Sequence, residues 1–179
     1  MARSAGLYEP SFEHDACGVN FVADLKGRKS HSIVQMGLGA LCNLEHRGAT
    51  GADVNSGDGA GILMQVPDRF LRDVVPFRLP REGGYATGIA FLPQDEEQAA
   101  AGVSQIESIV EDEGLEVLGW RDVPTDPSML GRAAAQTMPR FRQVFIAGRG
   151  LSSLALDRYV YMVRKRIEHE IHLMEGRTR

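Results

Sequence analysis

Segments with strand-like and helix-like patterns follow one another along the whole chain, and this mixture constrains the fold more than any other feature. Alternating or continuous apolar runs predict strands, whereas apolar residues spaced three and four apart predict helices. The expected strands cover residues 18–23, 62–66, 86–92, 115–120, 143–147 and 158–163, and the expected helices cover 32–45, 96–113 and the charged stretch with Ile167 and Ile171. No fixed repeat or low-complexity linker interrupts this order, so we expect an α+β fold without an internal domain boundary.

Polar residues and glycines refine two of the helices. Asp95 is expected to cap the second helix and Gly114 to end it, while Ser32 begins a capping-box pattern at the first. The first helix contains Gly37 and Gly39, each of which costs roughly 1 kcal/mol relative to alanine. We therefore expect this helix to pack closely against a neighbouring element, namely a sheet.

Composition excludes several classes of protein. The 179 residues carry a net charge of −4, which gives no basic surface for nucleic acid or an anionic membrane. No apolar run reaches the roughly 18 residues that span a bilayer, and residues 1–10 contain no secretory hydrophobic core. Two cysteines cannot form a disulfide framework or a thiolate metal cage by themselves, so we expect a cytoplasmic protein with no metal.

Cys17 lies where cleavage of a short polar leader would make it N-terminal, in the run Asp-Ala-Cys-Gly-Val at 15–19. An N-terminal cysteine supplies both a nucleophilic thiol and a base, because its own α-amino group, with an ordinary pKa near ~8, can accept the thiol proton. The alternative is a buried structural thiol, which is a common role for free cysteine. For Cys42, which lies among apolar residues of the first helix with no adjacent cation, packing is the expected role.

Several short strings, in order and spacing, resemble one enzyme family. They are LYEP at 7–10, EHDACGV at 13–19, LEHRGA at 44–49, GDGAGIL at 57–63, GWRDVP at 119–124 and QVFI at 143–146. Together they resemble the start of the glutamate synthase large subunit, where that family has a class II glutamine amidotransferase domain. The resemblance covers nearly the whole chain.

The resemblance implies a four-layer αββα fold of the N-terminal-nucleophile hydrolase type, which this chain would contain in a form truncated at its C-terminus. Residues 1–16 would be a leader removed on maturation, and 17–179 the N-terminal part of the amidotransferase domain. Cys17 would attack the side-chain amide of L-glutamine, releasing ammonia and leaving a γ-glutamyl thioester that water hydrolyses to glutamate.

The resemblance also implies cofactors and partners outside this segment. In the family the ammonia travels to a downstream synthase domain, where it meets 2-oxoglutarate and reduction yields a second glutamate. The full-length enzyme would hold FMN and an iron–sulfur cluster, with an electron-donating small subunit as a further partner. This segment itself is expected to bind no cofactor.

Arg47 and Gly48 match the family's arginine–glycine segment beside the catalytic cysteine, which implies a substrate-binding role. A fixed guanidinium favours a nearby thiolate and can orient glutamine, and glycine lets the backbone approach the site closely. The alternative for Arg47 is to bond carbonyls of the glycine-rich turn. His46 is expected to pack or to hydrogen-bond locally.

Two other patterns favour structural interpretations. The glycine-rich run at 57–61 lacks the lysine of a nucleotide-binding loop and leads into an expected strand, so it predicts a turn with positive φ. His169 and His172 lie on the charged last helix, where a solvated face is expected in place of a metal site.

The chain departs from the family pattern in ways that bear on activity. Asn20 stands where the family usually has glycine, and a segment like Arg-Phe-Ser-Thr and the Asn-Gly oxyanion pair do not occur. One missing oxyanion donor costs about two to three orders of magnitude in turnover. We therefore expect an N-terminal fragment with almost no activity alone. The alternatives are a stand-alone amidotransferase subunit of a split glutamate synthase and a non-catalytic, amidotransferase-like binding module.

Overall fold

The computed structural model describes residues 18–44, 55, 57 and 59–177, with side chains as far as Ile171. The chain forms two compact units, each built from two separate stretches of sequence. The N-terminal unit comprises Met1–Gln65 and Asp126–Thr137, and the sheet unit comprises Val66–Thr125 and Met138–Arg179. Because neither unit is continuous, no linker of distinct composition marks the boundary between them.

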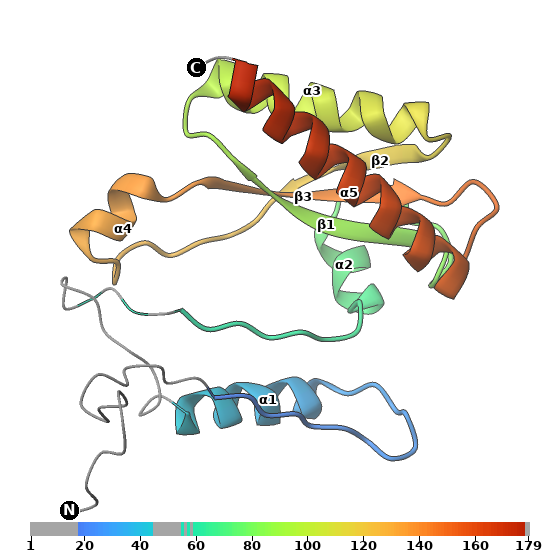
Figure 1. Ribbon diagram of the computed structural model, residues 1–179. Helices are drawn as coiled ribbons and strands as arrows, with labels where there is room; N and C mark the ends of the chain where they lie inside the picture. The colour runs from blue at the N-terminus through green and yellow to red at the C-terminus, as the bar shows by residue number, and fades with distance from the viewer. Residues whose placement is uncertain (1–17, 45–54, 56, 58, 178–179) are drawn as a thin grey trace, which may run out of the picture. The chain divides into compact units, whose positions relative to one another are not determined.

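A three-stranded antiparallel sheet organises the sheet unit, with the strand order β1-β3-β2 (Figure 1). The strands are β1 (Tyr85–Leu92), β2 (Glu116–Asp122) and β3 (Arg140–Ala147). Tyr85 of β1 and Glu116 of β2 both lie opposite Ala147 of the central strand. The strands predicted at 86–92, 115–120 and 143–147 are confirmed, and β3 begins three residues earlier than predicted.

Alternate residues of β3 enter two separate hydrophobic clusters, one on each face of the sheet. Val144 and Ile146 pack with residues of α3 (Glu96–Asp112) and α5 (Ser153–Arg177), the two helices on one face of the sheet in Figure 1. Phe145, which is 0% exposed, packs on the other face with Leu71 of α2 (Asp68–Val74). The central strand therefore anchors both sides of the unit.

The ends of α3 agree with the sequence-based prediction. The Asp95 side chain accepts a hydrogen bond from the backbone N–H of Gln98 at 2.9 Å. At the other end Gly114 has φ +72, and the N–H of Leu115 donates to the carbonyl of Val110 at 3.1 Å. These two bonds satisfy backbone groups that the helix itself leaves unpaired.

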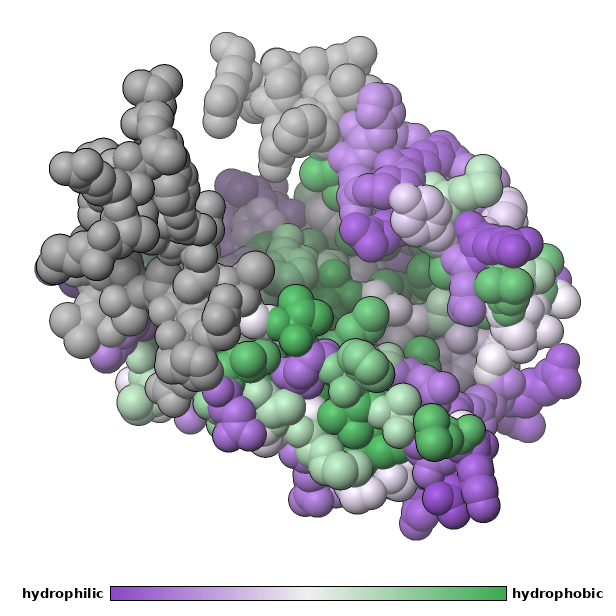
Figure 2. Space-filling model, turned by 60° about the horizontal axis from the view of Figure 1, so that its bottom comes forward, coloured by the Kyte–Doolittle hydropathy of each residue, from purple (hydrophilic) through white to green (hydrophobic). Residues whose placement is uncertain are grey.

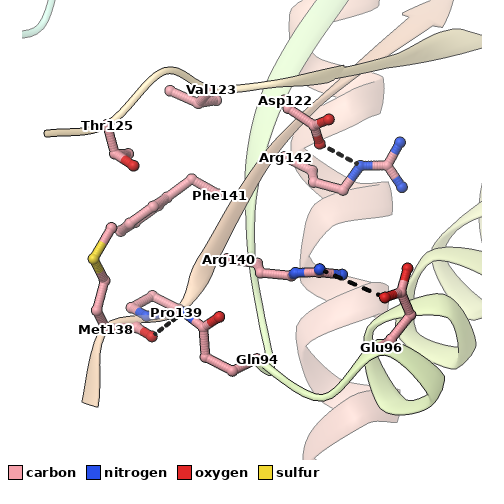
Figure 3. Close-up of a pocket in the computed structure, with 10 residues that line it drawn as sticks. All are labelled: Gln94, Glu96, Asp122, Val123, Thr125, Met138, Pro139, Arg140, Phe141 and Arg142. Carbon is pink, nitrogen blue, oxygen red and sulfur yellow. Dashed lines mark hydrogen bonds and ion pairs between the residues drawn. The ribbon is translucent and has the colours of Figure 1, made fainter. Parts of the chain in front are cut away.

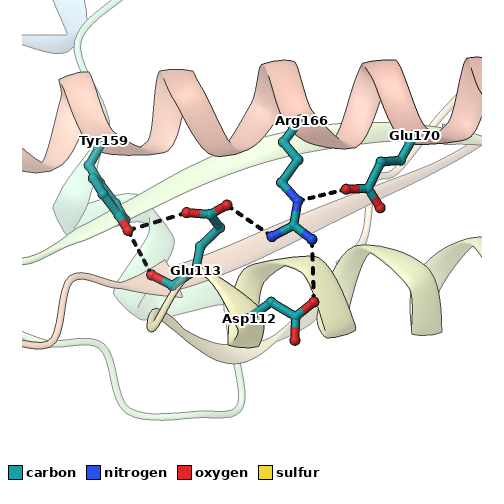
Figure 4. A network of polar contacts seen from close by, with 5 residues as sticks. All are labelled: Asp112, Glu113, Tyr159, Arg166 and Glu170. Atoms are coloured by element: carbon teal, nitrogen blue, oxygen red, sulfur yellow. Dashed lines mark hydrogen bonds and ion pairs between the residues drawn. The ribbon is translucent and has the colours of Figure 1, made fainter.

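A polar network joins α3 to α5 (Figure 4). The guanidinium of Arg166 on α5 donates to Glu170 at 2.6 Å and to Glu113 at 2.9 Å, and it lies 3.4 Å from Asp112. Tyr159 donates to the backbone carbonyl of Glu113 at 2.9 Å. The carboxylates of Glu170 and Glu113 hold the pKa of Arg166 above its ordinary value.

No described helix is both long and apolar enough to cross a membrane.

The strand predicted at 158–163 is wrong, because these residues belong to α5. Their valines and tyrosines favour strand locally, but the buried residues Leu156 and Val163 are seven apart, which places them on one helix face. Packing of that face decides the structure. The short helices α2 and α4 (Arg132–Thr137) were not predicted, since seven and six residues give almost no periodic signal.

The helix predicted at 32–45 is confirmed as α1 (His31–Asn43) in the N-terminal unit. The capping box at Ser32 is wrong, because the N-cap is Ser30 and Ser32 lies inside the helix. The hydroxyls of the two serines bond each other at 2.8 Å, and Ser30 makes no side-chain cap bond. A turn precedes α1 at Gly27, which has φ +68 and an N–H that donates to the Asp24 carbonyl.

Two strands predicted in the N-terminal unit, at 18–23 and 62–66, are absent: the described residues there form no ladder. A strand requires a neighbour for its backbone groups, and all the described strands lie in the sheet unit. Val19 and Phe21 are each 92% exposed, and Leu63 is fully exposed. Figure 2 shows exposed hydrophobic residues, in green, interspersed with hydrophilic ones, in purple. Among the described residues, every buried hydrophobic side chain belongs to the sheet unit.

Candidate functional site

The three residues that the sequence predicts for the site, Cys17, Arg47 and Gly48, lie outside the described residues. Their roles therefore stay predictions. The described chain does include the residue after Cys17, which is Gly18, and Leu44, three positions before Arg47.

Gly18 and Leu44 are in close contact within the N-terminal unit. A Cβ atom added to Gly18 would lie 2.9 Å from Leu44 Cδ2, 3.0 Å from Cδ1 and 3.2 Å from Cβ. All three distances are shorter than the roughly 3.5 Å of an ordinary carbon–carbon contact. Leu44 is also the C-cap of α1, and its N–H donates to the Leu41 carbonyl at 2.9 Å. The end of α1 is therefore packed against the backbone at Gly18, the residue that follows Cys17 in the sequence.

The face of α1 that carries Gly37 packs against an extended segment of the same unit. A Cβ on Gly37 would lie 3.3 Å from Ile62 Cδ1, which confirms close packing at this position. The neighbour is not the expected sheet, because residue 62 lies outside any strand. Gly39 has open space within 4 Å, so the same prediction is wrong there. Gly59 has φ +78, as expected for the glycine-rich turn.

Cys42 is exposed on α1, so the expectation that it packs in the interior is wrong. It lies one and two positions from Leu41 and Ala40, which are half-buried, and successive helical residues turn to different faces. Cys42 is thus an accessible thiol on the same helix that contacts Gly18.

One hollow in the sheet unit has a volume of about 460 Å³ (Figure 3). It contains two ion pairs: Arg142 Nε lies 3.2 Å from Asp122 without hydrogen-bond geometry, and Arg140 lies 3.9 Å from Glu96. Gln94 donates to the Met138 carbonyl at 2.7 Å. The lining residues include no cysteine, serine or histidine, so this hollow supplies no nucleophile of the predicted kind.

A second hollow of the sheet unit has a volume of about 310 Å³ and is lined in part by Arg81, Glu116 and Arg149. It too contains none of the predicted site residues. Among the residues whose side chains are described, no group of three histidine, cysteine or acidic residues could hold a metal ion.

Comparison with known proteins identifies the family of the chain. The family model of the class-II glutamine amidotransferases matches residues 17–179, beginning at Cys17. The chain belongs to this family. Residues 1–16 lie outside the match.

Relatives of the amidotransferase chain include several glutamate synthases. It is 42% identical over 172 residues to the NADPH glutamate synthase large chain of Bacillus subtilis, covering 94% of this chain and 11% of that protein. It is 40% identical to the chloroplastic ferredoxin-dependent glutamate synthase of Oryza sativa, covering 93% and 10%. It is 34% identical to the NADH glutamate synthase of Schizosaccharomyces pombe, covering 96% and 9%. The chain spans about a tenth of the length of these relatives.

Sequence reasoning did not find Leu44 as a partner of Gly18. Leu44 belongs to the string at 44–49 that carries the family resemblance. The two residues are 26 positions apart, so no local pattern links them.

Proposed function

We propose that this chain is the glutaminase part of a glutamate synthase and that Cys17 is its nucleophile. The observation that carries the proposal is the family match that begins at Cys17, together with the identity to glutamate synthases over more than nine-tenths of the chain. Removal of residues 1–16 would make Cys17 the N-terminal residue.

The proposed reaction follows from the chemistry of an N-terminal cysteine. The α-amino group of Cys17 accepts the thiol proton, and the sulfur attacks the amide carbon of the glutamine side chain. The tetrahedral oxyanion collapses, the C–N bond breaks, and the amine proton passes to the departing ammonia. Water then attacks the γ-glutamyl thioester, which releases glutamate and restores the thiol.

Arg47 and Gly48 are proposed to bind the glutamine beside Cys17. The contact between Gly18 and Leu44 supports this proposal, because it joins the described residue next to Cys17 to the helix end that precedes Arg47. A guanidinium in this position would favour the thiolate and orient the carboxylate of the substrate.

We further propose the four-layer αββα fold for the amidotransferase domain. The class II family match and the antiparallel sheet with α3 and α5 packed on one face support this proposal. Residues 17–179 would then be the N-terminal part of the amidotransferase domain, with the remaining strands and the oxyanion donors supplied by other parts of the protein.

In the whole enzyme the ammonia would pass to a synthase domain and react with 2-oxoglutarate. The FMN and iron–sulfur cluster implied for that enzyme do not fit the residues of this chain. A cluster needs three or four cysteine ligands where the chain has two cysteines, and the glycine-rich run lacks a phosphate-binding lysine. The names of the relatives specify three different electron donors, NADPH, ferredoxin and NADH. They therefore do not identify the electron donor of the enzyme to which this chain belongs. A reactive thiol at Cys17 supports a reducing, cytoplasmic location.

The test is glutamate production from glutamine by the full-length protein. Cys17→Ala should abolish it, whereas Cys42→Ala, which removes the exposed thiol of α1, should leave it unchanged. Ammonium supplied in place of glutamine should still support synthesis of glutamate from 2-oxoglutarate by Cys17→Ala, which shows that the rest of the protein is folded. Unchanged hydrolysis in Cys17→Ala would refute the proposal and favour a non-catalytic module.

A further inference from the structure

The contact between Gly18 and Leu44 distinguishes Gly18 from other glycines of the N-terminal unit. Gly27, Gly39, Gly59 and Gly61 have no atom within 4 Å of an added Cβ, whereas Gly18 has three Leu44 carbons within 3.2 Å. The Leu44 side chain therefore occupies the volume that any larger residue at 18 would need.

Leu44 is itself held in place by the helix. Its N–H donates to the Leu41 carbonyl in the last turn of α1, and α1 lies so close to Ile62 that a Cβ added to Gly37 would be 3.3 Å from Ile62 Cδ1. The side chain of Leu44 thus presents a fixed apolar surface to the backbone at Gly18.

We propose that Leu44 is a positioning residue for the nucleophile. It packs on Gly18 and so restricts the backbone at Gly18, the residue bonded directly to Cys17. This inference rests on the proposed function, because it predicts that the contact between Leu44 and Gly18 affects the rate of glutamine hydrolysis. A displacement of about 1 Å in a reacting group can lower the rate about 100-fold, so the fit of leucine against glycine matters directly for catalysis.

The experiment is a double-mutant cycle in the full-length protein that changes the side-chain sizes at positions 18 and 44. The kcat and KM of glutamine hydrolysis are measured for each variant. Leu44→Ala, which removes the fixed surface, should lower kcat about 10-fold to 100-fold and leave KM nearly unchanged. Gly18→Ala should lower kcat at least as much, because its methyl group overlaps Leu44. The double variant should recover kcat at least 5-fold relative to Gly18→Ala, because it restores the lost space. Leu44→Met, of similar volume, should stay within a few-fold of wild type.

Two controls separate positioning from general loss of structure. Leu38→Ala makes the same truncation at an exposed position of α1 and should leave kcat unchanged. The rate of alkylation of Cys17, measured by peptide mass spectrometry relative to exposed Cys42, should fall in Leu44→Ala and recover in Leu44→Met.

The outcomes are distinct. Equal effects of Leu44→Ala and Leu38→Ala, or a double variant no better than Gly18→Ala, would overturn the positioning role. If the positioning role fails in this way but Cys17→Ala still abolishes hydrolysis, the proposed function is retained without the positioning role. If Cys17→Ala retains hydrolysis, the proposed function itself fails.

Discussion

Replacing Gly119 by alanine should destabilise the sheet unit strongly, because β2 has no room for a methyl group there. Gly119 has φ +155 and follows a register shift between β2 and β3. A Cβ atom would lie 2.6 Å from Phe77 Cε1 and 2.7 Å from Cδ1, about 0.9 Å closer than the ~3.5 Å of an ordinary contact. Either the strand or the ring must move.

The Phe77 ring cannot move without loss. It meets Phe145 edge to face, with ring centroids 5.3 Å apart, and Phe145 lies at the centre of its cluster. Overpacking a core costs about 1–3 kcal/mol. The loss of an aromatic pair costs about 0.5–1.5 kcal/mol more. We therefore expect Gly119→Ala to lower the free energy of unfolding by about 1.5–4.5 kcal/mol.

Urea denaturation measured by fluorescence tests this directly, because Trp120 is the single tryptophan and packs in the core of the sheet unit. Gly88→Ala is the matched control: it lies on β1 of the same sheet, and its Cβ would meet Val144 at an ordinary 3.8 Å. The control should change the free energy of unfolding by less than about 1 kcal/mol. Adding Phe77→Leu to Gly119→Ala should cost less than the sum of the two single changes. Equal stability of the two alanine variants, or additivity with Phe77→Leu, would refute the steric argument.

Three further changes have defined outcomes. Asp95→Ala should lower the free energy of unfolding in the same assay by about 1 kcal/mol, because α3 loses its N-terminal cap. Asp95→Asn should retain most of this stability, since asparagine also caps helices. Equal losses in the two variants would contradict the capping role. Burial, and then the hydrogen bond to Asp68, raise the pKa of Tyr85 above its ordinary 10.0, so the folded state keeps a proton that the unfolded state releases. Stability should therefore fall as pH rises above about 10, and Tyr85→Phe should flatten that dependence; an unchanged slope would contradict it. Gly39→Ala, with open space around its Cβ, should slow hydrogen exchange in α1 by an amount corresponding to up to about 1 kcal/mol, and faster exchange would show an unrecognised contact.

Local chemistry explains which parts of the fold could be predicted. The cap at Asp95, the ending at Gly114 and the period of the buried residues between them all lie within one short stretch, and α3 is confirmed. The three strands of the sheet likewise carry clear apolar patterns. At 158–163 the valines and tyrosines favour a strand, but the buried residues Leu156 and Val163 have helical spacing. Packing of that helix face decides the structure.

Other features depend on partners that sequence cannot reveal. The segments 18–23 and 62–66 have strand-like composition, but a strand needs a neighbour, and the described residues of the N-terminal unit offer none. At the site, Cys17 could be proposed from its own chemistry because thiol and amine belong to one residue. The contact of Gly18 with Leu44 arises only when the chain folds back on itself.

The most direct test of the central claim is the intact mass of the full-length protein before and after exposure to an electrophilic glutamine analogue. We predict a protein that begins at Cys17 and gains one adduct, which Cys17→Ala abolishes and Cys42→Ala does not. A protein that keeps residues 1–16 and takes no adduct, or one that is labelled equally in Cys17→Ala, would contradict the assignment of Cys17 as the nucleophile.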